Sequence, residues 1–324
     1  MKQRKVLVTG ASGFVGSRVV DRLLLDHTIE VLAGTRRPKG DLPAGATPVV
    51  MGAQGEGRDE LSLAGVQAVI HCAARVHVMN EQSSDPLAEF RKVNVEGSLA
   101  LARRAAADGV ERFIFISSIK VNGEGTDGRR PYQADELPHP VDPYGISKLE
   151  AEQALQALAQ ETGMGVVIIR PVLVYGPGVK ANFQAMMKWL VKKVPLPLGL
   201  VHNKRSMVAL DNLVDLISVC IDHPNALNQV FLASDGEDLS TPELLRRTAK
   251  ALGTKATLLP IPAWVLKAAA RAIGRTGVAE RLCGSLQVDI GKTQQLLDWT
   301  PPLSVDQALS LTARHYLDLE RSKA

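Results

Sequence analysis

The first half of the chain alternates short apolar runs with longer amphipathic segments. Six runs are rich in Val, Ile or Phe and end in small or turn-forming residues, as buried parallel strands do: KVLVTG, EVLAGT, TPVVMG, AVIHCAA, RFIFISS and GVVIIRP. Three segments between them have the period of an amphipathic helix: FVGSRVVDRLLL, DPLAEFRKVNVEGSLALARRAAADG and DPYGISKLEAEQALQALAQETG. Strand–helix–strand units connect with right-handed crossovers, which place helices on both faces of one sheet. The pattern therefore predicts an α/β fold with a Rossmann-type, doubly wound parallel sheet.

The pattern changes after Pro171. VYGPGVKANF and VKKVPLPLGLVHNKR are rich in turn formers, SMVALDNLVDLISVCIDH predicts a return strand and a helix, and QVFLAS predicts another strand. The remainder alternates helical segments with proline-rich turns. We therefore expect a sheet domain at residues 1–176, rejoined by 207–234, and a smaller, interleaved C-terminal lobe formed by 177–206 and 235–324.

Composition and charge narrow the classes of partner. The chain has 324 residues, of which 22% are charged and 45% hydrophobic, as in a soluble globular protein. A formal charge of +4 suits an anionic small molecule, but Lys and Arg do not form the stripe typical of nucleic-acid binding. Three distant cysteines without a His-rich partner segment indicate reduced, buried thiols and no metal site.

No apolar run has the length needed to span a bilayer, and the N-terminus lacks the apolar region of a signal peptide. A cytoplasmic protein without an integral membrane segment is the expectation. The stretch AWVLKAAARAIGR from Ala263 is basic and amphipathic, so it could lie on a membrane surface. An ordinary surface helix is the preferred interpretation of this stretch.

A glycine motif, Gly10-Ala-Ser-Gly13-Phe-Val-Gly16, lies between the first predicted strand and the first helix. Glycines there permit a tight turn and close backbone approach to a pyrophosphate, which the N–H groups of the helix N-terminus then bind. A purely structural turn is the alternative, but the position at the start of a βαβ unit favours a dinucleotide. The expected cofactor contacts in this loop are Gly10, Ser12, Gly13, Phe14, Val15 and Gly16.

The end of the second predicted strand bears on which dinucleotide binds. An acid at this place would bind the ribose 2′-hydroxyl of NAD, whereas arginine accommodates the 2′-phosphate of NADP. Here Thr35 takes the place of the acid, and Arg36 and Arg37 follow. NADP(H) is therefore favoured and NAD(H) remains possible, with a solvated basic loop as the alternative interpretation of the arginines.

Tyr144 and Lys148 are four residues apart on a predicted helix, which places both side chains on one face. The strand RFIFISS ends in Ser117 and Ser118, and strand ends line the ligand crevice of this fold. A serine can hold a carbonyl oxygen and a tyrosine can exchange a proton with it. A nearby ammonium lowers the tyrosine pKa from its ordinary value of ~10. Beside a nicotinamide these groups predict an oxidoreductase site.

The chain contains, in order, TGASGFVG, HCAA, VNVEG, SSIKVNG, PYGISK and RPVLVYGPG. With these motifs it resembles the extended short-chain dehydrogenase/reductase family, that is, the NAD(P)-dependent nucleotide-sugar epimerases and dehydratases. The resemblance implies an NAD(P)-binding sheet domain, a lobe that binds a nucleotide-sugar, and a homodimer formed by the helices near Asp85 and Tyr144. It implies that Ser118 positions the substrate, Tyr144 is the acid/base, and Lys148 binds the nicotinamide ribose. It also implies that Ala73, Ala74, Asn94 and Pro171 flank the cofactor.

Two other polar residues of these motifs have a simpler interpretation. Ser117 precedes the position of the family's serine, so we expect its hydroxyl to bind backbone. His71 in IHCAA is interpreted as a structural histidine in the crevice wall, since Tyr144 already fills the role of base.

Three residues of the smaller lobe match the family's contacts to the sugar diphosphate. Asn182 and Arg205 stand where an asparagine and an arginine grip the substrate, and a planar guanidinium can bind phosphate oxygens in pairs. Arg281 lies near another nucleotide-contacting arginine, although the usual RxGD pattern is missing. The resemblance therefore implies a UDP-sugar substrate held by Asn182, Arg205 and Arg281.

Departures from the family patterns narrow the reaction. Ile119-Lys120 replaces the Asp-Glu pair of the dehydratases, and SSIKVNG differs from the SSATVYG of 4-epimerases. AARVHVMNE, FISSIKVNGE and GSLQVD resemble a bacterial O-antigen and surface-polysaccharide subgroup. Some of its members look like reductases of UDP-4-keto-6-deoxy-N-acetylglucosamine that give UDP-N-acetylquinovosamine. The leading hypothesis is thus an NADPH-dependent 4-ketoreductase. A 4-epimerase of UDP-glucose or a UDP-N-acetylhexosamine with bound NAD is the second, and a nucleotide-sensing regulator is the third.

Overall fold

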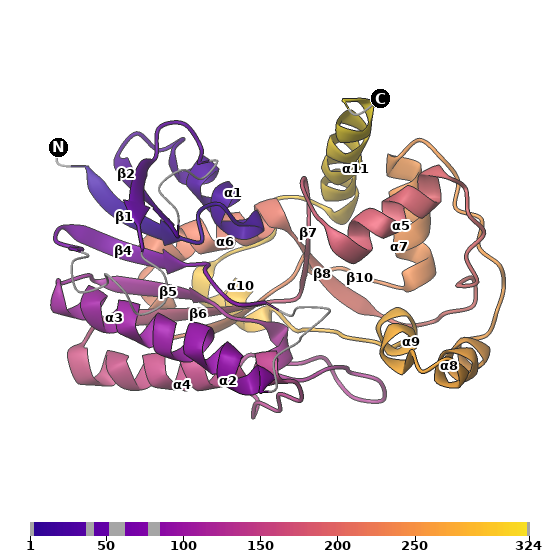
Figure 1. Ribbon diagram of the computed structural model, residues 1–324, viewed down its shortest axis with the longest axis horizontal. Helices are drawn as coiled ribbons and strands as arrows, with labels where there is room; N and C mark the ends of the chain where they lie inside the picture. The colour runs from indigo at the N-terminus through magenta and orange to yellow at the C-terminus, as the bar shows by residue number, and fades with distance from the viewer. Residues whose placement is uncertain (1–2, 37–41, 52–61, 77–84, 323–324) are drawn as a thin grey trace.

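A computed structural model of the chain describes residues 3–36, 42–51, 62–76 and 85–322. Its centre is a seven-stranded sheet in which every neighbouring pair is parallel (Figure 1). The strand order is β3 (Thr47–Val50), β2 (Ile29–Thr35), β1 (Arg4–Thr9), β4 (Val66–His71), β5 (Arg112–Ile116), β6 (Gly165–Pro171) and β9 (Val230–Ala233). The reversal between β1 and β4 is the arrangement of a doubly wound sheet, so the predicted fold class is confirmed.

Helices cover both faces of the sheet. One face packs α1 (Phe14–Leu23) and α6 (Leu210–Asp222), and the other packs α3 (Gly97–Ala107) and α4 (Pro143–Thr162). Central strands are buried on both sides, and all residues of β6 are buried. The expectation of a buried strand at TPVVMG is wrong: β3 is the edge strand and most of it is exposed.

The long helix expected over 85–109 is divided. It consists of α2 (Pro86–Arg91), the π-helical turn η1 (Lys92–Glu96) and α3. A π-helical turn inserts an extra residue per turn and is frequent at functional sites. Here it surrounds Asn94, whose side chain is buried in the crevice wall.

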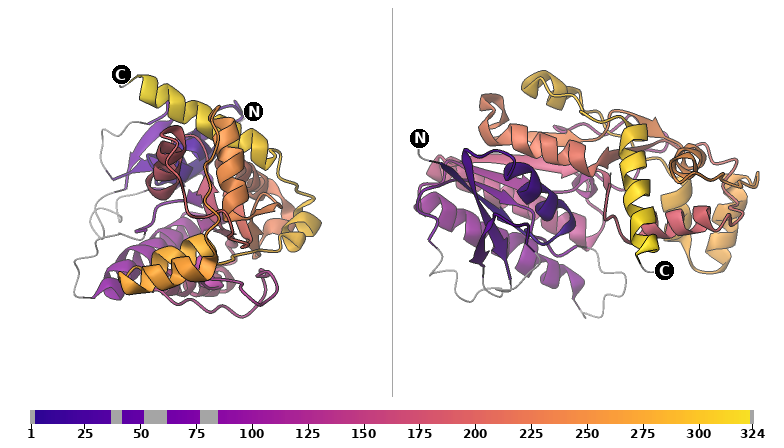
Figure 2. Two further views of the ribbon diagram at one scale, coloured as in Figure 1. Left: turned by 90° about the vertical axis from the view of Figure 1, so that its right-hand side faces the viewer. Right: turned by 90° about the horizontal axis from the view of Figure 1, so that it is seen from above.

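A second, three-stranded sheet has the order β10 (Asp238–Leu239), β8 (Arg205–Ala209) and β7 (Leu173–Tyr175). The strand β8 was expected to return to the large sheet, but it pairs with β7 and β10, and β9 makes the return instead. The helices of the smaller lobe are α5 (Ala181–Val191), α7 (Thr241–Ala251), α8 (Ala263–Ala272), α9 (Thr276–Cys283) and α11 (Val305–Arg321). Helix α10 (Gly291–Leu297) packs on the large sheet instead, where Thr293 Oγ1 donates to the carbonyl oxygen of Leu232 in β9 at 2.9 Å. Figures 1 and 2 show α5, α7, α8 and α9 beyond one end of the large sheet.

Short 3₁₀ turns, η2 (Ile119–Val121) and η3 (Pro224–Ala226), complete the regular structure. Within the described residues, no helix is both long enough and apolar enough to cross a membrane. All three cysteines are free thiols. The domain boundaries given above remain predictions.

Candidate active site

The glycine loop brings two backbone segments into closer contact than a side chain would permit. Gly10 has φ of +68°, and a Cβ atom there would lie 2.8 Å from the backbone nitrogen of Ala73. A Cβ on Gly16 would lie 2.2 Å from the carbonyl oxygen of Gly10. Helix α1 begins at Phe14 without a side-chain cap or an acid in its first turn. Its N–H groups and positive dipole end therefore fit the pyrophosphate of a dinucleotide.

The other residues of the loop divide into exposed and packed ones. Ser12 and Gly13 are exposed at the turn, whereas Phe14 and Val15 are packed against the hydrophobic core. Phe14 and Val15 can therefore offer backbone groups, but not their side chains, to a phosphate.

Asn94 forms hydrogen bonds to the backbone of Arg75, in the segment after β4 that faces the glycine loop. Its Oδ1 accepts a hydrogen bond from the backbone nitrogen of Arg75 at 2.8 Å, and its Nδ2 donates to the carbonyl oxygen of Arg75 at 3.1 Å. The same Nδ2 donates to Ser147 Oγ at 3.0 Å. Asn94 thus ties the Ala73–Ala74 turn to helix α4, which carries the tyrosine.

The strand β2 ends at buried Thr35, and exposed Arg36 follows directly. Arg36 is therefore free to turn toward a ligand at the end of β2. Arg37 lies outside the described residues. Pro171 is the last residue of buried β6. Because the strands are parallel, it lies at the same carboxyl ends of the sheet as Thr35.

Helix α4 carries Tyr144 in its first turn. Asp142 caps the start of the helix, where its Oδ1 accepts a hydrogen bond from the backbone nitrogen of Gly145 at 2.6 Å. Tyr144 is half-buried and lies edge-on to Phe90, with ring centroids 5.9 Å apart. The Ser118 side chain is close enough to lower the pKa of Tyr144. The structure thus brings Ser118, two residues after β5, near Tyr144.

Lys148 lies one turn further along α4 and is buried. Its Nζ donates to the carbonyl oxygen of Ile116 at 2.7 Å and lies 3.8 Å from the centre of the Phe115 ring. Burial lowers the pKa of Lys148 to about 7, and the nearby carboxylate of Glu152 opposes this shift.

Burial acts on Tyr144 in the direction opposite to our expectation. It raises the tyrosine pKa to about 12, against a smaller lowering by the Ser118 hydrogen bond and a further raising by Asp142. The expectation that the lysine keeps this pKa below its ordinary value is therefore wrong for the described geometry, in which burial has the largest effect.

Sequence reasoning missed a buried ion pair directly beneath the site. Arg170, in β6, donates to Glu152 with Nη2 and Oε2 2.5 Å apart. Ser117 also donates to Glu152, so the expectation that its hydroxyl binds backbone is wrong. Two signals were present: an arginine within an otherwise apolar strand, and an acid four residues after Lys148 on the same helix.

A second missed pair joins the serine segment to the tyrosine helix. Lys120 Nζ lies 2.6 Å from Asp142 Oδ2 and 2.7 Å from Glu124 Oε1. Because Asp142 also begins α4, Lys120 holds the start of this helix beside η2. The positions of Ser118 and Tyr144 are therefore linked through a single ammonium.

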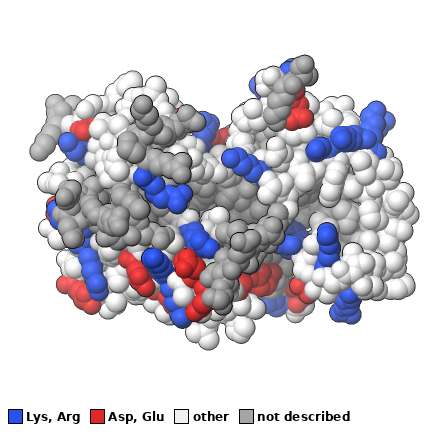
Figure 3. All heavy atoms as spheres, viewed as in Figure 1, with Lys and Arg blue, Asp and Glu red and all other residues white. Residues whose placement is uncertain are grey.

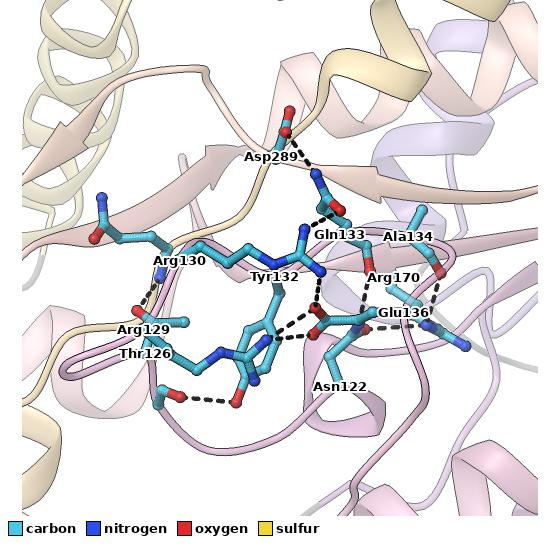
Figure 4. A network of polar contacts seen from close by, with 12 residues as sticks. Asn122, Thr126, Arg129, Arg130, Tyr132, Gln133, Ala134, Glu136, Arg170 and Asp289 are labelled. Atoms are coloured by element: carbon cyan, nitrogen blue, oxygen red, sulfur yellow. Dashed lines mark hydrogen bonds and ion pairs between the residues drawn. The ribbon is translucent and has the colours of Figure 1, made fainter.

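Asn122 continues these contacts toward the smaller lobe (Figure 4). Its Oδ1 accepts from Arg170 Nη1 at 3.1 Å, and its Nδ2 donates to the carbonyl oxygen of Gln133 at 3.0 Å. Gln133 in turn donates to Asp289 at 3.4 Å. The residue that replaces the tyrosine of SSATVYG thus connects β6 with the chain segment after α9.

His71 has both ring nitrogens in hydrogen bonds. Nδ1 lies 2.7 Å from Thr9 Oγ1, and Nε2 lies 2.9 Å from Ser98 Oγ. The ring also stacks on Phe115, with centroids 6.0 Å apart. This environment is that of a structural histidine between β1, β4 and α3.

The three expected substrate contacts have different surroundings. Arg205 is half-buried at the start of β8, and its Nη1 donates to the carbonyl oxygen of Gly284 at 3.1 Å. Burial lowers the pKa of Arg205, with Asp127 opposing the shift. Arg281 is exposed near the end of α9, just before Gly284, and Asn182 is exposed in the first turn of α5. Arg205 and Arg281 are therefore brought onto adjoining segments, while Asn182 comes from a separate helix.

Known proteins resemble this chain over almost its whole length. A family model described as "NAD dependent epimerase/dehydratase family" matches residues 6–233. A UDP-glucose 4-epimerase of Vibrio cholerae is 46% identical over 317 residues, which are 97% of this chain and 96% of that protein. A GDP-6-deoxy-D-mannose reductase of Pseudomonas aeruginosa is 26% identical over 315 residues, 94% of this chain and 95% of that protein.

Among solved structures, the UDP-glucose 4-epimerase of Thermotoga maritima with UDP-glucose superposes with a TM-score of 0.78. The two sequences are 25% identical, and the match covers 98% of this chain and 99% of the other. The Vibrio cholerae relative extends the likeness over the lobe beyond the region of the family model. The chain belongs to the NAD dependent epimerase/dehydratase family, the extended short-chain dehydrogenases and reductases.

Proposed function

We propose that the protein is a UDP-sugar 4-epimerase that retains NAD. The Ser118–Tyr144 contact at the end of β5 carries the proposal, because it places a hydroxyl that can hold an oxygen beside one that can exchange its proton. The relative at 46% identity bears the name of this activity and supports it over the ketoreductase that the sequence motifs favoured.

In this proposal Tyr144 accepts the proton of the sugar C4 hydroxyl and later returns it to the C4 oxygen. Ser118 holds that oxygen while the sugar turns over in the pocket. A bound NAD would supply the hydride acceptor and donor for C4 and, in its oxidised form, a positive charge in the site. Since burial raises the pKa of Tyr144 to about 12, its phenolate needs a nearby positive charge.

The other residues would bind and orient the two ligands. The domain at 1–176 with 207–234 would hold the cofactor through its glycine loop, Asn94 and Lys148. The lobe at 177–206 and 235–324 would hold the nucleotide-sugar, with Arg205 on its diphosphate. A homodimer formed by the helices near Asp85 and Tyr144 stays a prediction.

A 4-ketoreductase of a UDP-6-deoxy-4-keto-hexosamine is the second candidate. Two features favour it. Burial raises the pKa of Tyr144 to about 12, which favours the protonated form that a proton donor needs. Thr35 stands where NAD enzymes place an acid, and exposed Arg36 follows it. In that reaction NADPH would be consumed, and Tyr144 would protonate the C4 oxygen once.

One experiment separates the two reactions. Purified protein is given UDP-glucose or UDP-N-acetylglucosamine without added reductant, and NMR follows inversion at C4. In parallel, NADPH and NADH consumption is measured with UDP-4-keto-6-deoxy-N-acetylglucosamine. Inversion without reductant establishes the epimerase, whereas substrate-dependent loss of NADPH alone establishes the reductase. Absence of both reactions, with tight dinucleotide binding, would favour a nucleotide-sensing regulator.

A further inference from the structure

Two segments of the smaller lobe carry positive charge without any acid. Residues 188–204 and 250–279 contain nine of the 38 Lys and Arg and none of the 34 Asp and Glu. They run side by side: the backbone nitrogen of Leu196 donates to the carbonyl oxygen of Thr257, and that of Gly199 to Leu259, both at 2.9 Å. We call the surface formed by these two segments the basic end.

The basic end also exposes large apolar side chains. Trp264 is 72% exposed, Ile273 71% and Trp189 50%. Helix α8 contains no buried residue, although Ala263 and Leu266 pack against the lobe core. The other large apolar residues exposed in these segments are Val191, Val194, Leu200, Leu259 and Val278. Such a concentration of apolar surface marks an interaction site.

These features lie at one end of the molecule. The C-terminal end of α5, which carries Trp189, and the whole of α8 lie at the right-hand end in Figure 1, beyond the large sheet. The left view of Figure 2 looks onto this end, where α5, α7 and α8 lie in front. On the face drawn in Figure 3, the right-hand end shows Lys and Arg but no Asp or Glu.

Helix α8 has the composition of an interfacial helix. Trp264, Ala268 and Arg271 follow one another at helical spacing and all are exposed, so they line one side of the helix. Arg275, just beyond the end of the helix, is exposed too. An apolar ring at one end of such a row can enter the headgroup region, while guanidinium groups stay among lipid phosphates.

We propose that the basic end binds the surface of an anionic lipid bilayer. Cations near an anionic leaflet are attracted by its surface potential, and the exposed Trp and aliphatic side chains supply the apolar anchor. Nucleic acid would satisfy the charge but would leave Ile273, Val191 and Val194 in water. A second copy of this chain would bring nine like charges against nine others, which is unfavourable.

The basic end is close in the chain to the contact of Arg205, the arginine expected to bind the substrate diphosphate. Helix α9 follows α8 directly, and the residue after α9, Gly284, accepts the hydrogen bond of Arg205. A bilayer at the basic end would therefore lie against the lobe rather than the sheet. No residue of the basic end has a role in the reaction proposed above, so vesicle binding and turnover can be lost separately.

The test is sedimentation of the full-length protein with vesicles. Vesicles of phosphatidylglycerol and phosphatidylethanolamine are compared with vesicles of phosphatidylcholine, at low and high salt. We expect binding to the anionic vesicles, reduced by salt, and little binding to phosphatidylcholine. Failure to bind the anionic vesicles, or equal binding to both kinds, overturns the proposal.

Variants locate the contact. Arg271→Gln with Arg275→Gln should weaken binding about thirtyfold, as expected for the loss of two cations near an anionic surface. Trp264→Ser with Ile273→Ser should weaken it at least as much. Because these side chains are exposed, circular dichroism and melting should remain as in the unchanged protein.

Matched variants on the sheet domain serve as controls. Leu25 is 72% exposed, as Trp264 is, and Arg22 and Arg103 are exposed cations. Leu25→Ser, and Arg22→Gln with Arg103→Gln, should leave vesicle binding unchanged, and equal losses in these variants overturn the assignment. Light scattering that shows a dimer dissolved by Trp264→Ser with Ile273→Ser would assign the basic end to self-association instead.

Discussion

Arg170 and Glu152 form a salt bridge of 2.5 Å in which both side chains are almost fully buried. Glu152 also accepts the hydroxyl of Ser117 and lies one turn beyond Lys148, whose positive charge it favours. Arg170 reaches from β6 to Asn122 as well. One ion pair therefore connects the strand β6, the helix α4 and the segment that carries Ser118.

Arg170→Met should destabilise the fold by about 3–5 kcal/mol, because it leaves the Glu152 carboxylate buried without its cation. Arg170→Met combined with Glu152→Met should recover most of that loss, since no buried charge remains. Urea unfolding of the three proteins measures both effects.

The control is a more exposed ion pair, between α2 and α4. Arg91 and Glu150 meet at 2.6 Å with half-exposed side chains. Arg91→Met should cost no more than about 1 kcal/mol. If Arg91→Met costs as much as Arg170→Met, burial is not the cause of the larger effect.

The sequence allowed the fold to be predicted wherever a local pattern determines it. Strand runs and helix periods are local, and the glycine loop is recognisable because Gly10 and Gly16 are needed for backbone contacts within one βαβ unit. The edge position of β3 and the pairing of β8 with β7 were missed because they depend on which strands meet in space. The apolar pattern of β8 is the same in either sheet.

The candidate site was predictable to the same extent. Tyr144 and Lys148 share a helix, and Ser118 ends the neighbouring strand, so spacing and topology bring them together. The partners Arg170 and Glu152 come from different elements, and only their joint burial reveals them. The pKa of Tyr144 depends on burial, which one motif cannot give.

Tyr144→Phe should reduce turnover by at least about 10²–10⁴-fold, the usual range for loss of a general acid or base. Dinucleotide affinity should change little, because the hydroxyl contacts Ser118 rather than the glycine loop. Steady-state kinetics and calorimetric titration give the two numbers. Tyr132→Phe, which removes only a hydrogen bond to Gly125, is the control, and activity retained in Tyr144→Phe would refute the proposed role.

Lys148 should make stability depend on pH. Burial lowers its pKa to about 7 from 10.5, so between these values the unfolded chain binds more protons than the folded one. Stability contributed by this group therefore rises as pH rises from about 7 to 10. Urea unfolding of the unchanged protein and of Lys148→Met at pH 7 and pH 10 should show the unchanged protein gaining relative to the variant. An identical difference at both pH values would contradict the lowered pKa.

Asp142 and Ser304 allow the catalytic effect of a helix cap to be separated from its structural effect. Each begins a helix and accepts a hydrogen bond from a backbone nitrogen of the first turn. Asp142→Ala and Ser304→Ala should each cost about 1 kcal/mol of stability. Only Asp142→Ala should lower kcat, because the Asp142 carboxylate also binds Lys120 beside Ser118. Lowered kcat in both variants would attribute the effect to general destabilisation.

Comparing Gly10→Ala with Gly109→Ala separates two effects: the loss of the close backbone contact in the glycine loop, and the strain of a left-handed backbone. Both have positive φ, +68° and +79°, but a Cβ on Gly10 would lie 2.8 Å from the Ala73 nitrogen, whereas a Cβ on Gly109 would meet no atom within 4 Å. Each Gly→Ala change should cost about 1–2 kcal/mol of stability from strain. Gly10→Ala should in addition weaken dinucleotide binding by more than about tenfold, because either the loop or the Ala73 segment must move. Calorimetric titration with NAD and NADP on both variants tests this, and equal affinities in Gly10→Ala and Gly109→Ala would show that this close contact does not shape the dinucleotide site.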